Sequence, residues 1–122
     1  MSRETYFRAW DTYNEAWADE YLAIAEDGHV IEIKDDGTTE YWKDRFIIEF
    51  DTGLKDENGK EIYEGDIVDY NDDGDCIGYV VYNAPHYEIM EKIGYPCWLK
   101  GGPHQRVIGN IHENPELLEH KG

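Results

Sequence analysis

In the stretch "TGLKDENGKEIYEGDIV", residues 52–68, turn-forming residues separate short apolar runs, and this pattern specifies much of the fold. Thr52-Gly53 is expected to end a preceding strand, because glycine accepts backbone conformations that other residues avoid. Asn58-Gly59 then predicts an exposed hairpin tip, and a second bend is expected before the next strand. The residues that define this geometry are Gly53, Leu54, Asn58, Gly59, Gly65 and Asp66.

Short runs with apolar residues at every second position lie on both sides of this stretch, a pattern typical of an antiparallel β domain. Asp-Gly or Asn-Gly pairs punctuate them and predict hairpin turns. The second half of residues 15–27 is ambiguous, since its alanine and glutamate content favours helix, but its alternation and the following turn favour strand. The expected strands are residues 5–11, the second half of 15–27, 29–34, 45–50, 66–68, 76–83 and 106–111.

Three local features complete the expected architecture. Phe46, Ile48 and Phe50 form an apolar stripe along one strand, and residues 106–111 supply a late strand that closes a small barrel. Asn114 and Pro115 predict the N-cap and first turn of a short C-terminal helix docked by two leucines.

Residues 83–103 are the least readable part of the chain. Residues 86–94 suit one or two helical turns ending at Gly94, while 94–103 have the glycine and proline density of a surface loop.

Composition limits the classes of partner. The 28 acidic and 11 basic residues give a formal net charge of −17, which repels phosphate backbones and argues against direct binding of nucleic acid. The polar N-terminus and the lack of a long apolar run argue for a cytoplasmic protein without a membrane span. Cys76 and Cys97 have no metal-binding or disulfide-framework spacing, so both are expected to be reduced thiols.

Residues 69–74, "DYNDDG", resemble the first half of a calcium loop, with Asp69, Asn71 and Asp73 at the first, third and fifth ligand positions. The twelfth position, which needs a bidentate glutamate, is Val80. The pattern therefore favours a solvated acidic hairpin, and no metal site is expected.

No pattern indicates catalysis. Cys97 with His86 or His104 would make a thiol–base pair, but no surrounding signature supports it. The five histidines have no metal-ligand spacing, and no phosphate-binding glycine loop is present. We therefore expect no catalytic residues and no cofactor. Aromatic residues on barrel strands are instead candidates for protein binding, because such side chains are enriched at interfaces: Tyr63, Tyr70, Tyr79, Tyr82 and Trp98.

Three segments together resemble the YopX family of small phage and prophage proteins. They are "FRAW" at residues 7–10, the stretch at 52–68, and "VIGNIHENPELL" at 107–118, which contains Gly109 and Asn110. The resemblance implies a mainly β protein with an SH3-like barrel, encoded by phages or prophages of bacteria, and it supplies no catalytic residues.

The sequence thus predicts one domain over residues 1–122, with N-terminal strands in 1–50, an SH3-like barrel in 51–118 and a short C-terminal helix. The favoured function is a non-enzymatic β module that binds a host or phage protein or associates with itself as a homo-oligomer. The first alternative is an acidic DNA mimic that inhibits a host nucleic-acid-binding protein, and the second is an enzyme of uncharacterised activity.

Overall fold

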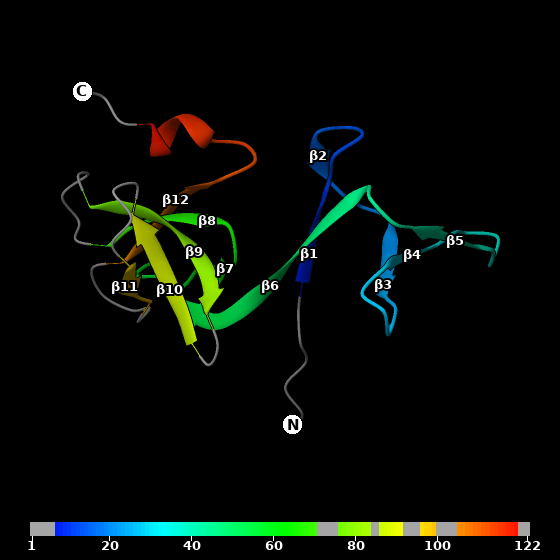
Figure 1. The fold of residues 1–122 in the computed structure, drawn as a ribbon, viewed down its shortest axis with the longest axis horizontal. Helices are drawn as coiled ribbons and strands as arrows, with labels where there is room; N and C mark the ends of the chain where they lie inside the picture. The colour runs from blue at the N-terminus through cyan, green and yellow to red at the C-terminus, as the bar shows by residue number, and fades with distance from the viewer. Residues whose placement is uncertain (1–6, 71–75, 84–85, 92–95, 100–104, 120–122) are drawn as a thin grey trace. The chain divides into compact units, whose positions relative to one another are not determined.

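The computed structural model of the chain describes residues 7–70, 76–83, 86–91, 96–99 and 105–119 (Figure 1). Regular structure in these ranges is β-strand apart from one 3-10 turn, so the prediction of a mainly β protein is confirmed. Contacts within the chain divide it into two compact units, Arg8–Ile48 and a unit formed by Met1–Phe7 with Glu49–Gly122. Strand β6 (Phe46–Lys55) contributes residues to both units.

The N-terminal unit, Arg8–Ile48, contains a hairpin and a three-stranded sheet. The hairpin pairs β1 (Phe7–Asp11) with β2 (Ala16–Trp17), and Trp10 opposite Trp17 places the two indole rings 5.1 Å apart. The sheet is antiparallel with the order β3-β4-β5, and its strands are β3 (Tyr21–Ile24), β4 (Val30–Ile33) and β5 (Thr39–Trp42). The ambiguous segment is therefore strand in its second half, as predicted.

Three hairpin tips share one construction. In each, a four-residue turn is closed by a hydrogen bond from the glycine N–H to the carbonyl three residues earlier, as from Gly28 to Ala25 (2.9 Å) and from Gly59 to Asp56 (3.0 Å). The glycines are left-handed, with φ of +89° at Gly28 and +80° at Gly59. The Asp or Asn before each glycine does not have a positive φ. The glycine alone is left-handed, which is typical of three-residue hairpin loops. The glycines act as predicted.

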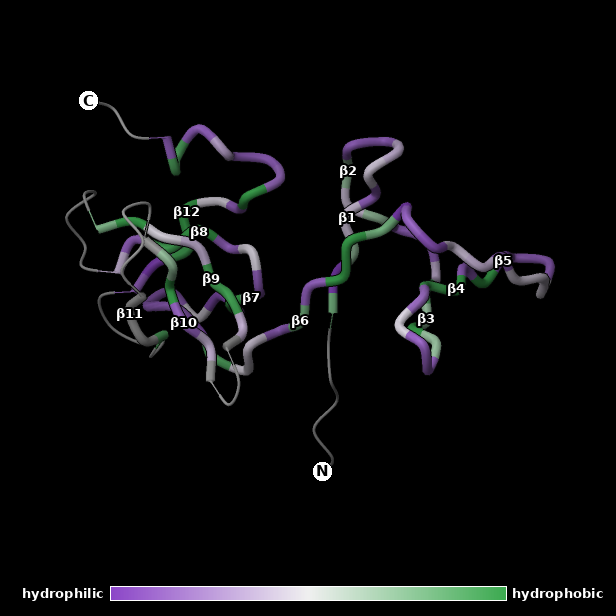
Figure 2. Tube along the Cα trace, viewed as in Figure 1, coloured by the Kyte–Doolittle hydropathy of each residue, from purple (hydrophilic) through white to green (hydrophobic). Residues whose placement is uncertain are grey.

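The C-terminal unit is built on a five-stranded antiparallel sheet with the order β11-β10-β9-β8-β12, which curls into half a barrel (Figure 1). Figure 2 shows hydrophobic residues along several of its strands. Its strands, with the short β7 that precedes them, are β7 (Glu61–Tyr63), β8 (Asp66–Asp69), β9 (Ile77–Asn83), β10 (His86–Glu91), β11 (Pro96–Trp98) and β12 (Arg106–Asn110). The core is one cluster of buried side chains: Ile62, Val68, Val80, Ile89 and Leu99.

Strand β6 differs from expectation in two ways. It does not end at Thr52-Gly53 but continues to Lys55, because a register shift with Gly53 at φ +83° absorbs the irregularity. The expected apolar stripe is also wrong at Phe50, which is 36% exposed, whereas its neighbour Glu49 is buried. Leu54, one of the residues named from the sequence, is partly buried and packs against the core.

The prediction of helical turns at 86–94 followed by a loop is wrong in the described part. His86–Glu91 and Pro96–Trp98 are strands, because β9 pairs with β10 on one side and β11 pairs with it on the other. Pairing with the two neighbouring strands here overrides local helix propensity.

The predicted C-terminal helix is a single 3-10 turn, Pro115–Leu118, with proline in its first turn as expected. The side chain of Asn114 makes no capping hydrogen bond to the turn. It is already engaged, since its Oδ1 accepts the N–H of Asn110 at 3.2 Å.

Candidate functional site

A buried hydrogen bond joins β6 to the segment 107–118 of the C-terminal unit. His112 Nε2 and Glu49 Oε2 are 2.9 Å apart, and their side chains are 9% and 6% exposed. Gly65, at φ +81°, lies directly over this carboxylate, and a Cβ there would sit 2.1 Å from Glu49 Oε2. Only glycine satisfies both the backbone angle and this contact.

Two asparagines extend this arrangement toward the C-terminal turn. Asn110 Oδ1 accepts the N–H groups of His112 (3.0 Å) and Glu113 (2.9 Å), and a Cβ on Gly109 would lie 2.6 Å from Asn114 Oδ1. We name the set Glu49, Gly65, Asn110, His112 and Asn114 the polar lock. Its polar groups bind one another and connect β6, the end of β12 and the C-terminal turn, so their role is structural.

Two further aspartates of the motifs also serve the backbone. Asp66 Oδ2 accepts the N–H of Tyr63 at 2.8 Å beside the bend at Gly65. Asp56 is buried and accepts the N–H groups of Asn58, Lys60 and Val107 at 2.9, 2.9 and 3.0 Å. Burial alone would raise the pKa of Asp56, but these backbone donors outweigh it and lower that pKa below its ordinary value.

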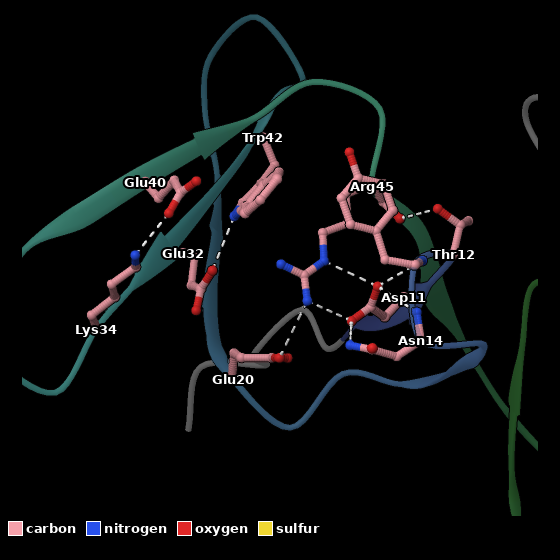
Figure 3. Close-up of polar contacts among 10 residues, drawn as sticks. Asp11, Thr12, Asn14, Glu20, Glu32, Lys34, Glu40, Trp42 and Arg45 are labelled. Atoms are coloured by element: carbon pink, nitrogen blue, oxygen red, sulfur yellow. Dashed lines mark hydrogen bonds and ion pairs between the residues drawn. The ribbon is translucent and has the colours of Figure 1, made fainter.

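A second polar cluster stabilises the N-terminal unit, as Figure 3 shows. Arg45 binds buried Asp11 through two parallel hydrogen bonds, Nε–Oδ1 at 3.0 Å and Nη2–Oδ2 at 2.8 Å. Its guanidinium lies over the rings of Trp42 (4.7 Å), Phe46 (4.8 Å) and Tyr13 (5.2 Å). The Arg45 hydrogen bonds hold the pKa of Asp11 well below its usual range.

The opposite faces of the three-stranded sheet differ sharply. Trp42, on one face, meets Tyr13 and donates a hydrogen bond to Glu32 Oε1 at 3.0 Å. The register places Leu22, Ile24 and Val30 on the same face as Trp42. On the second face it brings together another set, which we name the aromatic face: Tyr21, Ala23, Ile31, Ile33 and Tyr41. Tyr21 is 77% exposed, Tyr41 54% and Ile33 43%.

Tyr41 is held in place on this face. Its hydroxyl donates to Asp27 Oδ2 at 2.5 Å, and its ring meets that of His29 edge-on at 5.2 Å. The hydrogen bond from Tyr41 is the main reason that the pKa of Asp27 falls to about 2, and it raises the pKa of Tyr41. An exposed aromatic ring with a fixed orientation loses little entropy when it is covered.

An acidic pocket of about 350 Å³ opens at one end of the same sheet. Tyr21 and Ile33 of the aromatic face form part of its wall, and Lys34 also lines it, with its Nζ 2.7 Å from Glu40 Oε1. The carboxylates in the lining belong to Asp19, Glu20, Glu32 and Asp35.

The tyrosines singled out from the sequence do not form one exposed group. Tyr63, Tyr70 and Tyr79 are half-buried, and Tyr70 packs against the core. Tyr82 is 53% exposed, and its ring centroid is 4.9 Å from that of Tyr87. The side chain of Trp98 lies outside the described residues.

The calcium-loop residues are only partly described. Asp69 is buried in β8 with Oδ2 3.5 Å from Arg106 Nη2, while Asn71 and Asp73 lie outside the described residues. In the part of the chain that the structure describes, no group of His, Cys, Asp or Glu is arranged to hold a metal ion.

Cys76 is a free thiol. Among the described residues, no helix has the length and apolar character to cross a membrane.

The residues that sequence reasoning missed are those of the N-terminal unit. Arg45 and Asp11 are 34 positions apart, and no motif links them. The sequence does contain a pattern that indicates the aromatic face, since "YLAI" at 21–24 has no charged residue on either face of its strand. A strand of a small sheet with apolar residues on both faces predicts either full burial or an interface.

Comparison with known proteins agrees with the motifs. A family model described as "YopX protein" matches residues 6–119. The crystal structure of protein EF1440 from Enterococcus faecalis is similar, with 29% sequence identity and a TM-score of 0.63 over 97% of this chain and 100% of that one. No curated protein matches the chain.

Proposed function

Since the chain belongs to the YopX protein family and its motif residues are occupied in holding the fold, we propose that it is a non-enzymatic protein-binding module. The binding surface is the aromatic face of the N-terminal unit. The observation that carries the proposal is that Tyr21, Ile33 and Tyr41 stand side by side on one sheet face while remaining 77%, 43% and 54% exposed.

The composition of this face suits an interface. Tyrosine contributes a large apolar area with few rotatable bonds, and interface hot spots are enriched in it. Tyr41 is already oriented by Asp27, so a partner that covers it bears little of the cost of fixing its ring. On the opposite sheet face Trp42 contacts Tyr13 and Arg45, whereas the most exposed large apolar side chains of the sheet, Tyr21 and Tyr41, lie on the aromatic face.

We also propose a specific fold for the C-terminal unit and a cellular location for the protein. The curled sheet of the C-terminal unit is an SH3-like barrel that carries the N-terminal unit as an added binding element, and the protein is a phage or prophage accessory protein acting in the cytoplasm of a bacterial host. One observation that supports the barrel is that Leu54 of the β6–β7 hairpin packs on the core formed by the sheet. An experimental structure in which the β6–β7 hairpin leaves that core open to solvent would reject the barrel.

Paired variants test the binding surface. Tyr21→Ser combined with Ile33→Ser removes apolar area from the aromatic face, and Tyr82→Ser, on an exposed tyrosine of the C-terminal unit, is the matched control. Affinity capture from host lysate, together with light scattering for self-association, should show a partner or oligomer that the control retains and the double variant loses. Equal retention by both variants, or a strict monomer that captures nothing, would refute the proposal.

A further inference from the structure

We propose that the partner segment recognised by the aromatic face is extended and basic, that it adds a strand beside β3 (Tyr21–Ile24), and that it places a lysine or arginine side chain in the acidic pocket. This inference rests on the proposed function and names the chemistry of the partner.

Strand β3 has the properties of an edge that accepts another strand. It lies at the end of the order β3-β4-β5, and its register with β4 is regular from Tyr21 opposite Ile33 to Ile24 opposite Val30. Protein edges are commonly protected by charged residues, proline or bulges, and "YLAI" has none of them. An added strand would extend the sheet and continue the aromatic face over its alternate side chains.

The charge of the N-terminal unit selects a basic partner. Residues 8–48 contain eleven Asp or Glu against four Lys or Arg, a formal balance of −7. Three of the four cations have internal partners: Arg45 binds Asp11, Lys34 binds Glu40, and Arg8 lies 4.4 Å from the ring centroid of Trp17. The field around β3 is therefore negative, which attracts a cationic segment and speeds its association.

The acidic pocket is the place where a cationic side chain of the partner would bind. It lies where β3 begins, because Asp19 and Glu20 immediately precede Tyr21. Glu20 Oε2 is shielded from solvent and accepts no hydrogen bond from any described residue, while Glu20 Oε1 is 3.9 Å from Arg45 Nη2. A guanidinium or ammonium group entering beside the Tyr21 ring would meet carboxylates and an aromatic wall, both of which favour cations.

The same charges argue against a second copy of this chain as the occupant. Two copies joined through β3 would bring together two units that each have a formal balance of −7. Like charges held at such an interface weaken binding.

A synthetic peptide of alternating lysine and valine is the probe, and binding to the full chain is followed by calorimetry and by backbone NMR shifts. Two control peptides separate the contributions: one has glutamate in place of lysine, and the other has alternate backbone amides methylated, which keeps every charge but blocks strand pairing. We expect the lysine–valine peptide to shift the amides of residues 19–35 and both controls to bind at least about tenfold more weakly.

Protein variants locate the contacts. Asp19→Asn with Asp35→Asn should weaken the peptide about threefold to tenfold, as expected for two partly exposed ion pairs, and Glu116→Gln with Glu119→Gln in the C-terminal turn is the charge-matched control. Equal binding of the methylated peptide, shifts confined to residues 49–119, or a dimer lost in the Tyr21→Ser, Ile33→Ser variant would each overturn the proposal. If the peptide fails but that double variant still loses its captured partner, only the basic strand is rejected and the binding surface stands.

Discussion

At the scale of single residues, Gly65 shows why the family-like motif needs glycine. Gly59 and Gly65 have nearly the same φ, +80° and +81°, but a Cβ would meet nothing within 4 Å at Gly59 and would strike the Glu49 carboxylate at Gly65. Glu49 cannot move aside without breaking its hydrogen bond to His112. We expect Gly59→Ala to lower the free energy of unfolding by about 1 kcal/mol, and Gly65→Ala to lower it by about 3 kcal/mol.

Urea denaturation of the two variants measures this difference. In a Glu49→Ala background the cost of Gly65→Ala should fall to that of Gly59→Ala, because only the backbone strain remains. Equal costs for the two glycines in the wild-type background would show that the polar lock exerts no steric demand.

Arg45 has the corresponding role in the N-terminal unit. Arg45→Met leaves the buried carboxylate of Asp11 without its cation, and we expect the free energy of unfolding to fall by about 3 kcal/mol at neutral pH. Lys43→Met removes an exposed cation two positions earlier and should change it by less than about 0.5 kcal/mol. Tryptophan fluorescence reports on this unit, which contains Trp10, Trp17 and Trp42.

Acid should reduce the difference between wild type and Arg45→Met. The pKa of Asp11 is depressed in the folded state, so the stability it contributes is complete above the ordinary aspartate pKa of about 4 and is lost as the pH falls below that value toward the folded pKa. Urea unfolding at about pH 7 and about pH 3 tests the sign. A difference that stays constant between the two pH values would contradict the assigned interaction.

At the scale of elements, Asp56 ties the tip of the β6–β7 hairpin to β12 through Val107. Asp56→Asn replaces a charged acceptor of three N–H groups with a neutral amide, and we expect a loss of about 1–2 kcal/mol in unfolding free energy. Glu57→Gln, next in the chain and 4.0 Å from Arg106, is the control and should cost less than about 0.5 kcal/mol.

The readout for Asp56→Asn is amide exchange at Val107, which should quicken in this variant and not in Glu57→Gln. Because the pKa of Asp56 is lowered in the folded state, its contribution also persists above the ordinary aspartate pKa and is lost on acidification. Unchanged exchange at Val107 would show that the hairpin tip does not support β12.

Local sequence predicted the strands that glycine turns delimit, and it failed where pairing partners decide the conformation. Residues 66–68 follow the bend at Gly65, and residues 76–83 are an apolar run that follows Asp73-Gly74, so β8 and β9 could be predicted. Strand β10 could not, because the residues that make it a strand lie in β9 and β11. The burial of Glu49 could not be predicted for a similar reason, since its partner His112 is 63 positions away.

The candidate site was harder to predict than the fold. The sequence indicates tyrosines on strands of the C-terminal unit, but the exposure of a side chain depends on which sheet face is covered, and that is a tertiary property. Tyr21 and Tyr41 become neighbours of Ile33 and Ile31 only through the register of three strands.

At the scale of the whole molecule, we propose different roles for the two units. The C-terminal unit has the larger core, with Ile62, Ile67, Val68 and Ile89 fully buried, and the motif residues that secure it. The N-terminal unit has little buried apolar surface, and its aromatic face is left exposed. Stable scaffold and adaptable binding element are often separated in this way.

Hydrogen–deuterium exchange of the full chain, with and without the lysine–valine peptide, shows whether binding takes place at β3 and the aromatic face. We expect slower exchange at Tyr21–Ile24 when the peptide is bound, and unchanged exchange across β8 and β9. Protection that appears only within residues 49–119, with Tyr21–Ile24 exchanging at the same rate in both samples, would contradict it.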